Sequence, residues 1–146
     1  MIITKMTQSH VQQIAELEKI CFNDPWSVNS IASELENRLS LWLVAVDTDK
    51  VIGYVGSQTV LGETDMMNIA IHPDYRKQGI ATELIVSLIQ ALTDRSSHSL
   101  MLEVRSSNDP AKTLYAKLGF EVVGVRKNYY RNPREDALIL RKEWEV

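Results

Sequence analysis

The pattern of apolar and polar residues predicts two amphipathic helices near the start of the chain, after a short strand over residues 2–5. Ser9 is expected to cap the first helix in a capping box with Gln12, and the second helix is expected to begin at Ser27. The predicted buried faces consist of Val11, Ile14, Leu17 and Cys21 in the first helix and of Val28, Ile31 and Leu35 in the second. Each helix should therefore pack one face against a sheet.

The rest of the chain alternates between strand-like and helix-like segments. Residues 41–46 and 51–60 are joined by a polar turn and predict an antiparallel hairpin. The segments expected next are a turn at Gly62, a strand ending at Ile71, a helix from Gly79 to Leu92, a strand over 100–104, a helix capped by Asp109 and closed by Gly119, and strands over 120–125 and 136–141. Residues 126–135 are polar and aromatic, and we expect a loop there.

This order of elements predicts one α/β domain over residues 1–146, with a mixed, mostly antiparallel central sheet and helices on both faces. The net charge of -3 disfavours a role in binding nucleic acid, and a basic peptide would be a more compatible partner. Cys21 is the only cysteine and no Cys/His spacing suggests a metal site. Without an apolar run long enough for a bilayer or a signal-peptide pattern, we expect a cytoplasmic protein with no membrane contact.

The most informative stretch runs from Asn68 to Ile85, where a buried strand ends, a polar turn follows and a helix begins. The first N–H groups of a helix have no partner within it, so a phosphate or pyrophosphate is their natural ligand. Gly79 and Ala81 would let a bulky ligand approach the main chain, and Arg76 and Lys77 would add positive charge. A glycine in such a turn is by itself more often only a turn residue, so the pattern needs support from elsewhere in the chain.

Glu103 is a carboxylate in an otherwise apolar strand, where an unpaired charge is unfavourable. It shares a strand face with Arg105, so a structural ion pair is one explanation and proton transfer is another. Tyr115, on the next helix, is either a core tyrosine or a proton donor. Phe22 and Trp26 are either hydrophobic staples or walls of a substrate groove.

The stretch Arg76-x-x-Gly79-x-Ala81 resembles the acyl-CoA-binding motif of the GNAT N-acetyltransferases, and the order of elements is similar to that fold from end to end. The resemblance extends to the RimI type, the bacterial ribosomal-protein-alanine N-acetyltransferases. The segments that carry it are Met67-Asn-Ile-Ala-Ile71, Leu102-Glu-Val-Arg-Ser-Ser-Asn108, Leu114-Tyr-Ala-Lys-Leu-Gly-Phe120, Arg126-Lys-Asn-Tyr-Tyr130 and Arg134-Glu-Asp-Ala137, with Phe22-x-x-Pro25-Trp26 as a weaker match. The family often has glycine at Ala81 and a basic residue at Gln78, which leaves the affinity for the cofactor open.

This resemblance implies that acetyl-CoA is the co-substrate and that no metal is needed. It implies a pyrophosphate on the backbone of Lys77, Gln78, Gly79, Ile80, Ala81 and Thr82, and a pantetheine chain beside Ile69, Ala70 and Ile71 with Asn108 on its far side. It also implies that Glu103 is the general base, directly or through a water, and that Tyr115 is the general acid. Residues 22–26 and 128–131 would then wall the acceptor groove, without individual roles for Tyr129, Tyr130 or Arg131.

The acceptor implied by the resemblance is the α-amine of a small-subunit ribosomal protein that begins with alanine, modified by a monomeric enzyme. A lysine side chain or a small amine is an alternative acceptor, since Glu103 and Tyr115 would serve either. A catalytically silent acyl-CoA-binding module is a third interpretation, which the presence of both residues disfavours. A toxin that acetylates aminoacyl-tRNA is a fourth, which the acidic net charge disfavours.

Overall fold

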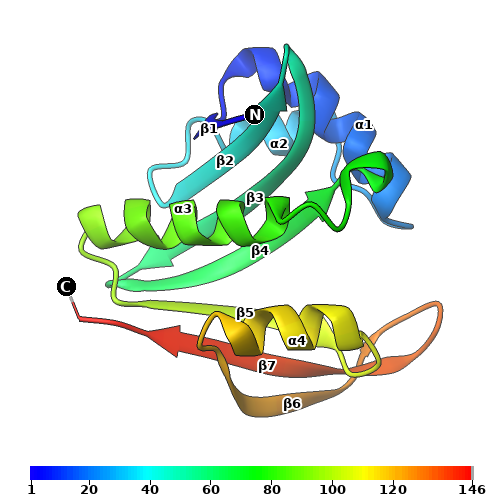
Figure 1. Cartoon of the computed structure of the whole chain (residues 1–146), viewed down its shortest axis with the longest axis vertical. Coiled ribbons are helices and arrows are strands. Elements are labelled where there is room, and N and C mark those ends of the chain that lie inside the picture. The colour runs from blue at the N-terminus through cyan, green and yellow to red at the C-terminus, as the bar shows by residue number, and fades with distance from the viewer. Residues whose placement is uncertain (146) are drawn as a thin grey trace.

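A computed structural model describes residues 1–145 of the chain. These residues form a seven-stranded sheet in the order β1-β2-β3-β4-β5-β7-β6, and neighbouring strands are antiparallel except for β4 and β5, which are parallel (Figure 1). The strands are β1 (Ile2–Lys5), β2 (Ser40–Asp47), β3 (Lys50–Val60), β4 (Glu63–Ile71), β5 (Ser99–Arg105), β6 (Glu121–Tyr130) and β7 (Glu135–Glu143). The helices are α1 (Val11–Cys21), α2 (Val28–Ser33), α3 (Ile80–Asp94) and α4 (Asp109–Lys117), with single 3-10 turns at Gln8–His10 and Pro73–Tyr75.

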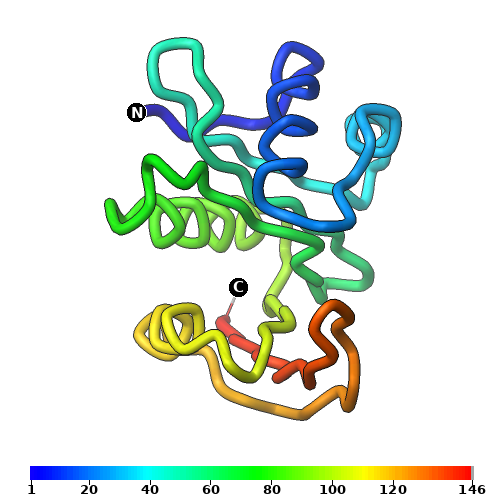
Figure 2. The backbone as a smooth tube through the Cα atoms, turned by 90° about the vertical axis from the view of Figure 1, so that its right-hand side faces the viewer, coloured from blue at the N-terminus to red at the C-terminus, as the bar shows by residue number. Residues whose placement is uncertain are grey.

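The helices cover both faces of the sheet: α3 and α4 lie on one side of the strands, and α1 and α2 lie on the other (Figure 2). Successive residues of β2 show this division, because Leu43 packs with α3 in one core and Val44 packs with α1 in the other. The predicted fold class, a mixed and mostly antiparallel sheet between helices, is therefore confirmed. Within residues 1–145, no helix combines the length and the apolar character needed to span a membrane.

Two tight hairpins form where the sequence predicts them. Thr48 and Asp49 join β2 to β3 with φ angles of 45° and 67°, and Leu61 and Gly62 join β3 to β4 with φ angles of 52° and 81°. Two consecutive residues with positive φ form the type I′ turn, whose twist matches that of the flanking strands. These turns fix the register of β2, β3 and β4, the strands against which α1 and α3 pack.

Strands β4 and β5 are joined at one end only. Glu63–Asp65 pair with Ser99–Met101, and the pairing stops there. Met67 has no partner in the register with β3, so it forms a β-bulge, which bends a strand. Beyond the bulge β4 turns away from β5, and the two strands diverge toward their carboxyl ends (Figure 1). We call this opening the split.

Three details of the predicted helices are wrong. Ser9 and Gln12 do not cap the first helix: Thr7 is the N-cap of the preceding 3-10 turn, where its N–H donates to His10 Nδ1 at 3.0 Å, and His10 is the N-cap of α1 without a side-chain capping bond. Asn108, not Asp109, caps α4. Because α2 ends at Ser33, Leu35 lies beyond the helix and is 36% exposed rather than buried.

The loop predicted over residues 126–135 is largely strand. Residues 126–130 belong to β6, and only 131–134 connect it to β7. The register of this hairpin shifts between Arg126 and Tyr130, and Asn128 has a positive φ of 53°. The irregular pairing and the polar side chains of an edge strand remove the alternation that marks a strand in sequence.

Candidate active site

The turn before α3 presents a run of backbone N–H groups without acceptors. None of the six N–H groups from Lys77 to Thr82 donates a hydrogen bond to an atom of residues 1–145, and the first bond of the helix runs from Glu83 N to Gly79 O at 3.1 Å. Lys77 and Gly79 have positive φ angles of 63° and 79°, and no atom lies within 4 Å of the place where a Cβ of Gly79 would be. Gly79 is therefore required by its backbone angle, and the space above it is open. This arrangement can bind phosphate groups.

The edge of β4 that borders the split carries backbone groups not used by the sheet. His72 N–H bonds to Ile52 O of β3 at 2.8 Å, and Ala70 is aligned with β3 in the same register. Because hydrogen bonding alternates along an antiparallel pair, the N–H and C=O groups of Ile69 and Ile71 point toward the split. An amide-bearing chain could add to this edge as a further strand.

Side chains of the protein contact this same edge. Asn68 Oδ1 accepts a hydrogen bond from the Ile69 N–H at 3.1 Å. Arg76 Nε donates to Ile71 O at 3.3 Å, and a terminal nitrogen of Arg76 lies 3.7 Å from Cys21 Sγ. The sequence predicts that Arg76 faces a phosphate, but its guanidinium turns toward the end of β4 instead.

On the opposite border of the split, Glu103 projects from the face of β5 that points away from α3, with its side chain 23% exposed. The suggested ion pair with Arg105 is wrong. Arg126 Nε donates to Glu103 Oε1 at 3.2 Å, whereas Arg105 bonds to Glu135 at 3.2 Å. The carboxylate is thus held by a residue of β6, two strands away in the sheet.

Glu135, the first residue of β7, fastens the turn that follows β5. It accepts hydrogen bonds from the Ser107 N–H at 2.6 Å and from Ser106 Oγ at 3.1 Å. Hydrogen bonds from Ser107, with those from Arg105 and Ser106, lower the pKa of the Glu135 carboxyl to about 2, although burial acts in the opposite direction. Arg105 also stacks on the Tyr130 ring, 4.4 Å from its centroid, so the end of β5 is tied to the β6–β7 hairpin.

Tyr115 lies on α4 with 3% of its surface exposed, and its ring packs against Phe120 at 5.3 Å. Its hydroxyl makes no hydrogen bond within residues 1–145 and is not sealed from solvent. Burial raises the pKa of Tyr115, and nearby Tyr130 raises it further. Burial, followed by the charge of Glu103, raises the pKa of Tyr130 to about 12. The charge of Glu103 thus acts on Tyr130, and Tyr130 acts on Tyr115.

Tyr130, Arg126 and Glu135 are site residues to which the sequence analysis gave no individual role. The adjacent tyrosines at 129 and 130, in an otherwise polar segment, were a sequence signal for Tyr130. Arg126 and Glu135 gave no such signal, because their ion pairs with Glu103 and Arg105 join strands distant in sequence. Asn108 uses Oδ1 to accept a hydrogen bond from the Ala111 N–H at 3.2 Å, which leaves its Nδ2 as a donor. Within residues 1–145 no group of His, Cys, Asp and Glu side chains is arranged to hold a metal ion.

The segment over residues 22–26, which we call the acceptor loop, and the turn between β6 and β7 lie on the same side of the sheet (Figure 2). Phe22 and Trp26 pack partly into the core beside α1, and Trp26 meets the Trp42 ring edge-on at 5.4 Å. Both residues therefore anchor the acceptor loop, as the staple interpretation expects, while Asn23, Asp24 and Pro25 are exposed.

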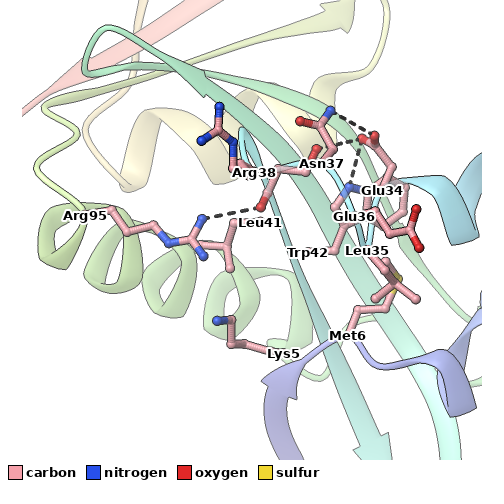
Figure 3. A pocket seen from close by; sticks show the side chains of 11 residues that line it. Lys5, Met6, Glu34, Leu35, Glu36, Asn37, Arg38, Leu41, Trp42 and Arg95 are labelled. Atoms are coloured by element: carbon pink, nitrogen blue, oxygen red, sulfur yellow. Dashed lines mark hydrogen bonds between the residues drawn. The ribbon is translucent and has the colours of Figure 1, made fainter.

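A separate pocket lies beside α2 and the start of β2 (Figure 3). Ser40 in its wall is opposite Gln58 of β3, which is opposite Asp65, so the pocket lies at the joined end of β4 and β5. Its buried carboxylate, Glu34, accepts hydrogen bonds from Asn37, Ser40, Trp42 and Gln58. This carboxylate is satisfied by the fold, and the β2 strand beside it is three strands across the sheet from β5, which carries Glu103.

Comparison with known proteins agrees with the geometry. The model of the acetyltransferase (GNAT) family matches residues 11–120. A ribosomal protein bS18-alanine N-acetyltransferase of Haemophilus influenzae is 36% identical over 142 residues, which cover 95% of this chain and 96% of that protein. The crystal structure of the ribosomal-protein-S18-alanine N-acetyltransferase from Escherichia coli aligns with a TM-score of 0.91 at 33% identity, covering 99% of this chain and 94% of that one. An aminoglycoside 6'-N-acetyltransferase solved with coenzyme A shares the fold, with a TM-score of 0.84 at 18% identity, covering 98% of this chain and 97% of that one. The chain belongs to the acetyltransferase (GNAT) family and groups within it with the bS18-alanine N-acetyltransferases.

Proposed function

We propose that this chain transfers the acetyl group of acetyl-CoA to the α-amine of the N-terminal alanine of ribosomal protein bS18. The names of its relatives support the acceptor. The observation that carries the chemistry is the split between β4 and β5, with free N–H donors on one border and Glu103 and Tyr115 on the other.

Acetyl-CoA is the acyl donor of the family, and the residues of the β4 border suit it. The N–H groups of Lys77, Gln78, Gly79, Ile80, Ala81 and Thr82 bind the pyrophosphate. The pantetheine amides add to the strand edge formed by Ile69, Ala70 and Ile71, with Asn108 Nδ2 as a further donor. The N–H at the end of this edge can also stabilise the oxyanion that forms at the thioester carbonyl.

The chemistry requires three proton movements. An α-amine has a pKa of about 8 and is mostly protonated at neutral pH, so Glu103 removes a proton from it, directly or through a water. The nitrogen then bonds to the carbonyl carbon and becomes positively charged. As the carbon–sulfur bond breaks, this nitrogen releases its second proton to solvent, and Tyr115 donates its own proton to the leaving sulfur. Burial raises the pKa of Tyr115, so the hydroxyl is protonated and available. Exchange with solvent then restores both groups.

The acceptor peptide enters from the face that carries the acceptor loop, between residues 22–26 and 128–131. Glu103 projects from this same face of β5. The enzyme is proposed to act as a monomer and without contacts to nucleic acid, in agreement with the net charge of -3.

The proposal is tested by measuring thiol release from acetyl-CoA with three short peptides. One begins with the N-terminal residues of bS18, one has that α-amine blocked, and one offers only a lysine amine. Turnover with the free α-amine alone is the expected result. Turnover with lysine alone would replace the proposal with a lysine acetyltransferase, and acetyl-CoA binding without turnover on any acceptor would indicate a silent module.

A further inference from the structure

Glu18 is a completely buried carboxylate in the middle of the apolar face of α1, with 0% of its surface exposed. Its neighbours on that face are Val11, Ile14 and Leu17. Burial raises the pKa of Glu18, and within residues 1–145 it forms no ion pair. A carboxylate costs free energy at such a position, where an apolar side chain would be favourable. Its hydrogen-bond partners should therefore explain why it is there.

Both oxygens of Glu18 hold a part of the proposed site. Oε1 accepts a hydrogen bond from the Trp26 N–H at 2.8 Å, at the end of the acceptor loop. Oε2 accepts one from Asn68 Nδ2 at 2.8 Å, and Asn68 Oδ1 in turn accepts one from the Ile69 N–H at 3.1 Å. A continuous chain of hydrogen bonds thus runs from the acceptor loop through α1 to the edge of β4.

This chain of hydrogen bonds reaches β4 at the place where the split begins. Asn68 directly follows the bulge residue Met67, where β4 leaves β5. Asn68 and Ala70 lie on the same face of β4, and Ala70 packs into the core beside α1. Glu103 projects from the corresponding face of β5, so Asn68 and Glu103 border the split on the side from which the acceptor would enter.

We propose that Glu18 and Asn68 are positioning residues, which fix the acceptor loop against the bulge of β4 and so set the distance between the acceptor amine and the acyl donor. This inference rests on the proposed function for its effect on turnover. The hydrogen-bonded link from the acceptor loop through Glu18 to Asn68 does not depend on that function, because the loss of Glu18 should loosen the acceptor loop whether or not the protein transfers an acetyl group.

The main test is the Glu18→Gln variant, which preserves size but places an NH2 group against a donor. The KM for the bS18 peptide is expected to rise about tenfold, as for the loss of one hydrogen bond to a charged group, while the Kd for acetyl-CoA stays within about twofold. Asn68→Ala is expected to act in the same direction, and the double variant should be little worse than either single variant, because both break one chain.

Ser97→Ala is the control. Ser97 is also a completely buried polar side chain, 0% exposed, but its hydroxyl bonds to Thr64 Oγ1 at 2.7 Å and to Gly62 O at 3.0 Å, at the joined end of β4 and β5. This variant is expected to lose stability without a change in the KM for the peptide. An equal rise in KM for Ser97→Ala would overturn the inference, since general destabilisation would then explain both results.

Hydrogen exchange separates failure of the inference from failure of the proposed function. In Glu18→Gln the amides of residues 22–24 and 26 are expected to exchange at least about tenfold faster than in wild type, because their anchor is lost. Unchanged exchange and unchanged KM in a folded variant would overturn the positioning role. A wild-type enzyme that is inactive on every α-amine peptide would refute the proposed function, while the exchange result would still decide whether the link exists.

Discussion

The two borders of the split use different parts of the polypeptide. The β4 border, from Ile69 to Thr82, offers main-chain N–H and C=O groups. The β5 border offers side chains: Glu103 is held by Arg126, Tyr130 stacks against Arg105, and Tyr115 lies on α4 within the influence of Tyr130. Main-chain groups are the same in every residue, whereas each side chain has a chemistry of its own.

In the proposed function, binding of acetyl-CoA belongs to the β4 border and proton transfer belongs to the β5 border. Binding by the main chain depends on backbone angles, so most substitutions on the β4 border should be tolerated and only those that change the angles should matter. Proton transfer on the β5 border depends on single functional groups, so conservative substitutions there should remove activity and leave binding intact. The predictions below test that division.

The largest effect is expected for Glu103→Gln, which removes the proposed base. Turnover at pH 7 should fall by about 10² to 10⁴-fold, as for loss of a general base, and the deficit should shrink above about pH 8, where the free amine predominates. Rates measured across pH 6–10 check this. Glu63→Gln is the control, because Glu63 pairs with Arg141 at the joined end of β4 and β5. A Glu103→Gln deficit that does not change with pH would exclude Glu103 as the base.

Tyr115→Phe should reduce turnover by roughly 10²-fold with little change in Tm, because the hydroxyl makes no hydrogen bond in the fold and the ring contacts with Phe120 are kept. The control is Tyr54→Phe, since the Tyr54 hydroxyl also has no hydrogen-bond partner within residues 1–145 but is sealed in the core beside α1. Because the pKa of Tyr115 is raised, wild-type activity should not fall through its ionisation below about pH 10. Full activity of Tyr115→Phe would contradict the acid assignment.

Gly79→Ala tests the backbone angle of the β4 border. At a φ of 79° an alanine is strained by about 1–2 kcal/mol, so relaxation of the loop should weaken acetyl-CoA binding by about 5 to 30-fold. Lys77→Ala, which removes only an exposed charge, should weaken binding by a smaller factor. Titration calorimetry on both variants decides the point, and a larger loss for Lys77→Ala would show that side-chain charge dominates this border.

The smallest effect concerns stability and Glu135. The pKa of this carboxyl falls from an ordinary value of 4.5 to about 2 in the folded protein, so its contribution is fully present above pH 4.5 and is lost as the pH falls toward 2. Wild type should therefore exceed Glu135→Gln in Tm at pH 6–7, and the gap should close between pH 4.5 and 2. Thermal melts over this range check the prediction, and a gap independent of pH would contradict it.

Local signals explain which parts of the fold the sequence predicts correctly. The β2–β3 hairpin and α3 carry strong periodicity with turn residues at both ends, and both are confirmed. The turn over residues 77–82 is also local, and the N–H groups expected to be free are free within residues 1–145. Their contact with a cofactor remains a prediction.

Long-range pairing explains the errors. The partner of Glu103 lies on β6 and not two residues away, and no local pattern indicates how β6 and β7 align. Glu18 was detectable, because it lies four residues after Ile14 on the predicted buried face of α1. Its role could not be predicted from the sequence, because its hydrogen-bond partners, the Trp26 N–H and the Asn68 side chain, are brought to it only by the fold.

The most direct test of the division between the two borders is titration of acetyl-CoA into wild type and into the double variant Glu103→Gln/Tyr115→Phe. If the β4 main chain holds the cofactor and the β5 side chains perform the chemistry, the inactive double variant should bind acetyl-CoA with a Kd within about threefold of wild type, which is below the tenfold change that 1.4 kcal/mol would produce. A loss of affinity of tenfold or more would contradict the account, because the side chains of the β5 border would then belong to the binding site as much as to the chemistry.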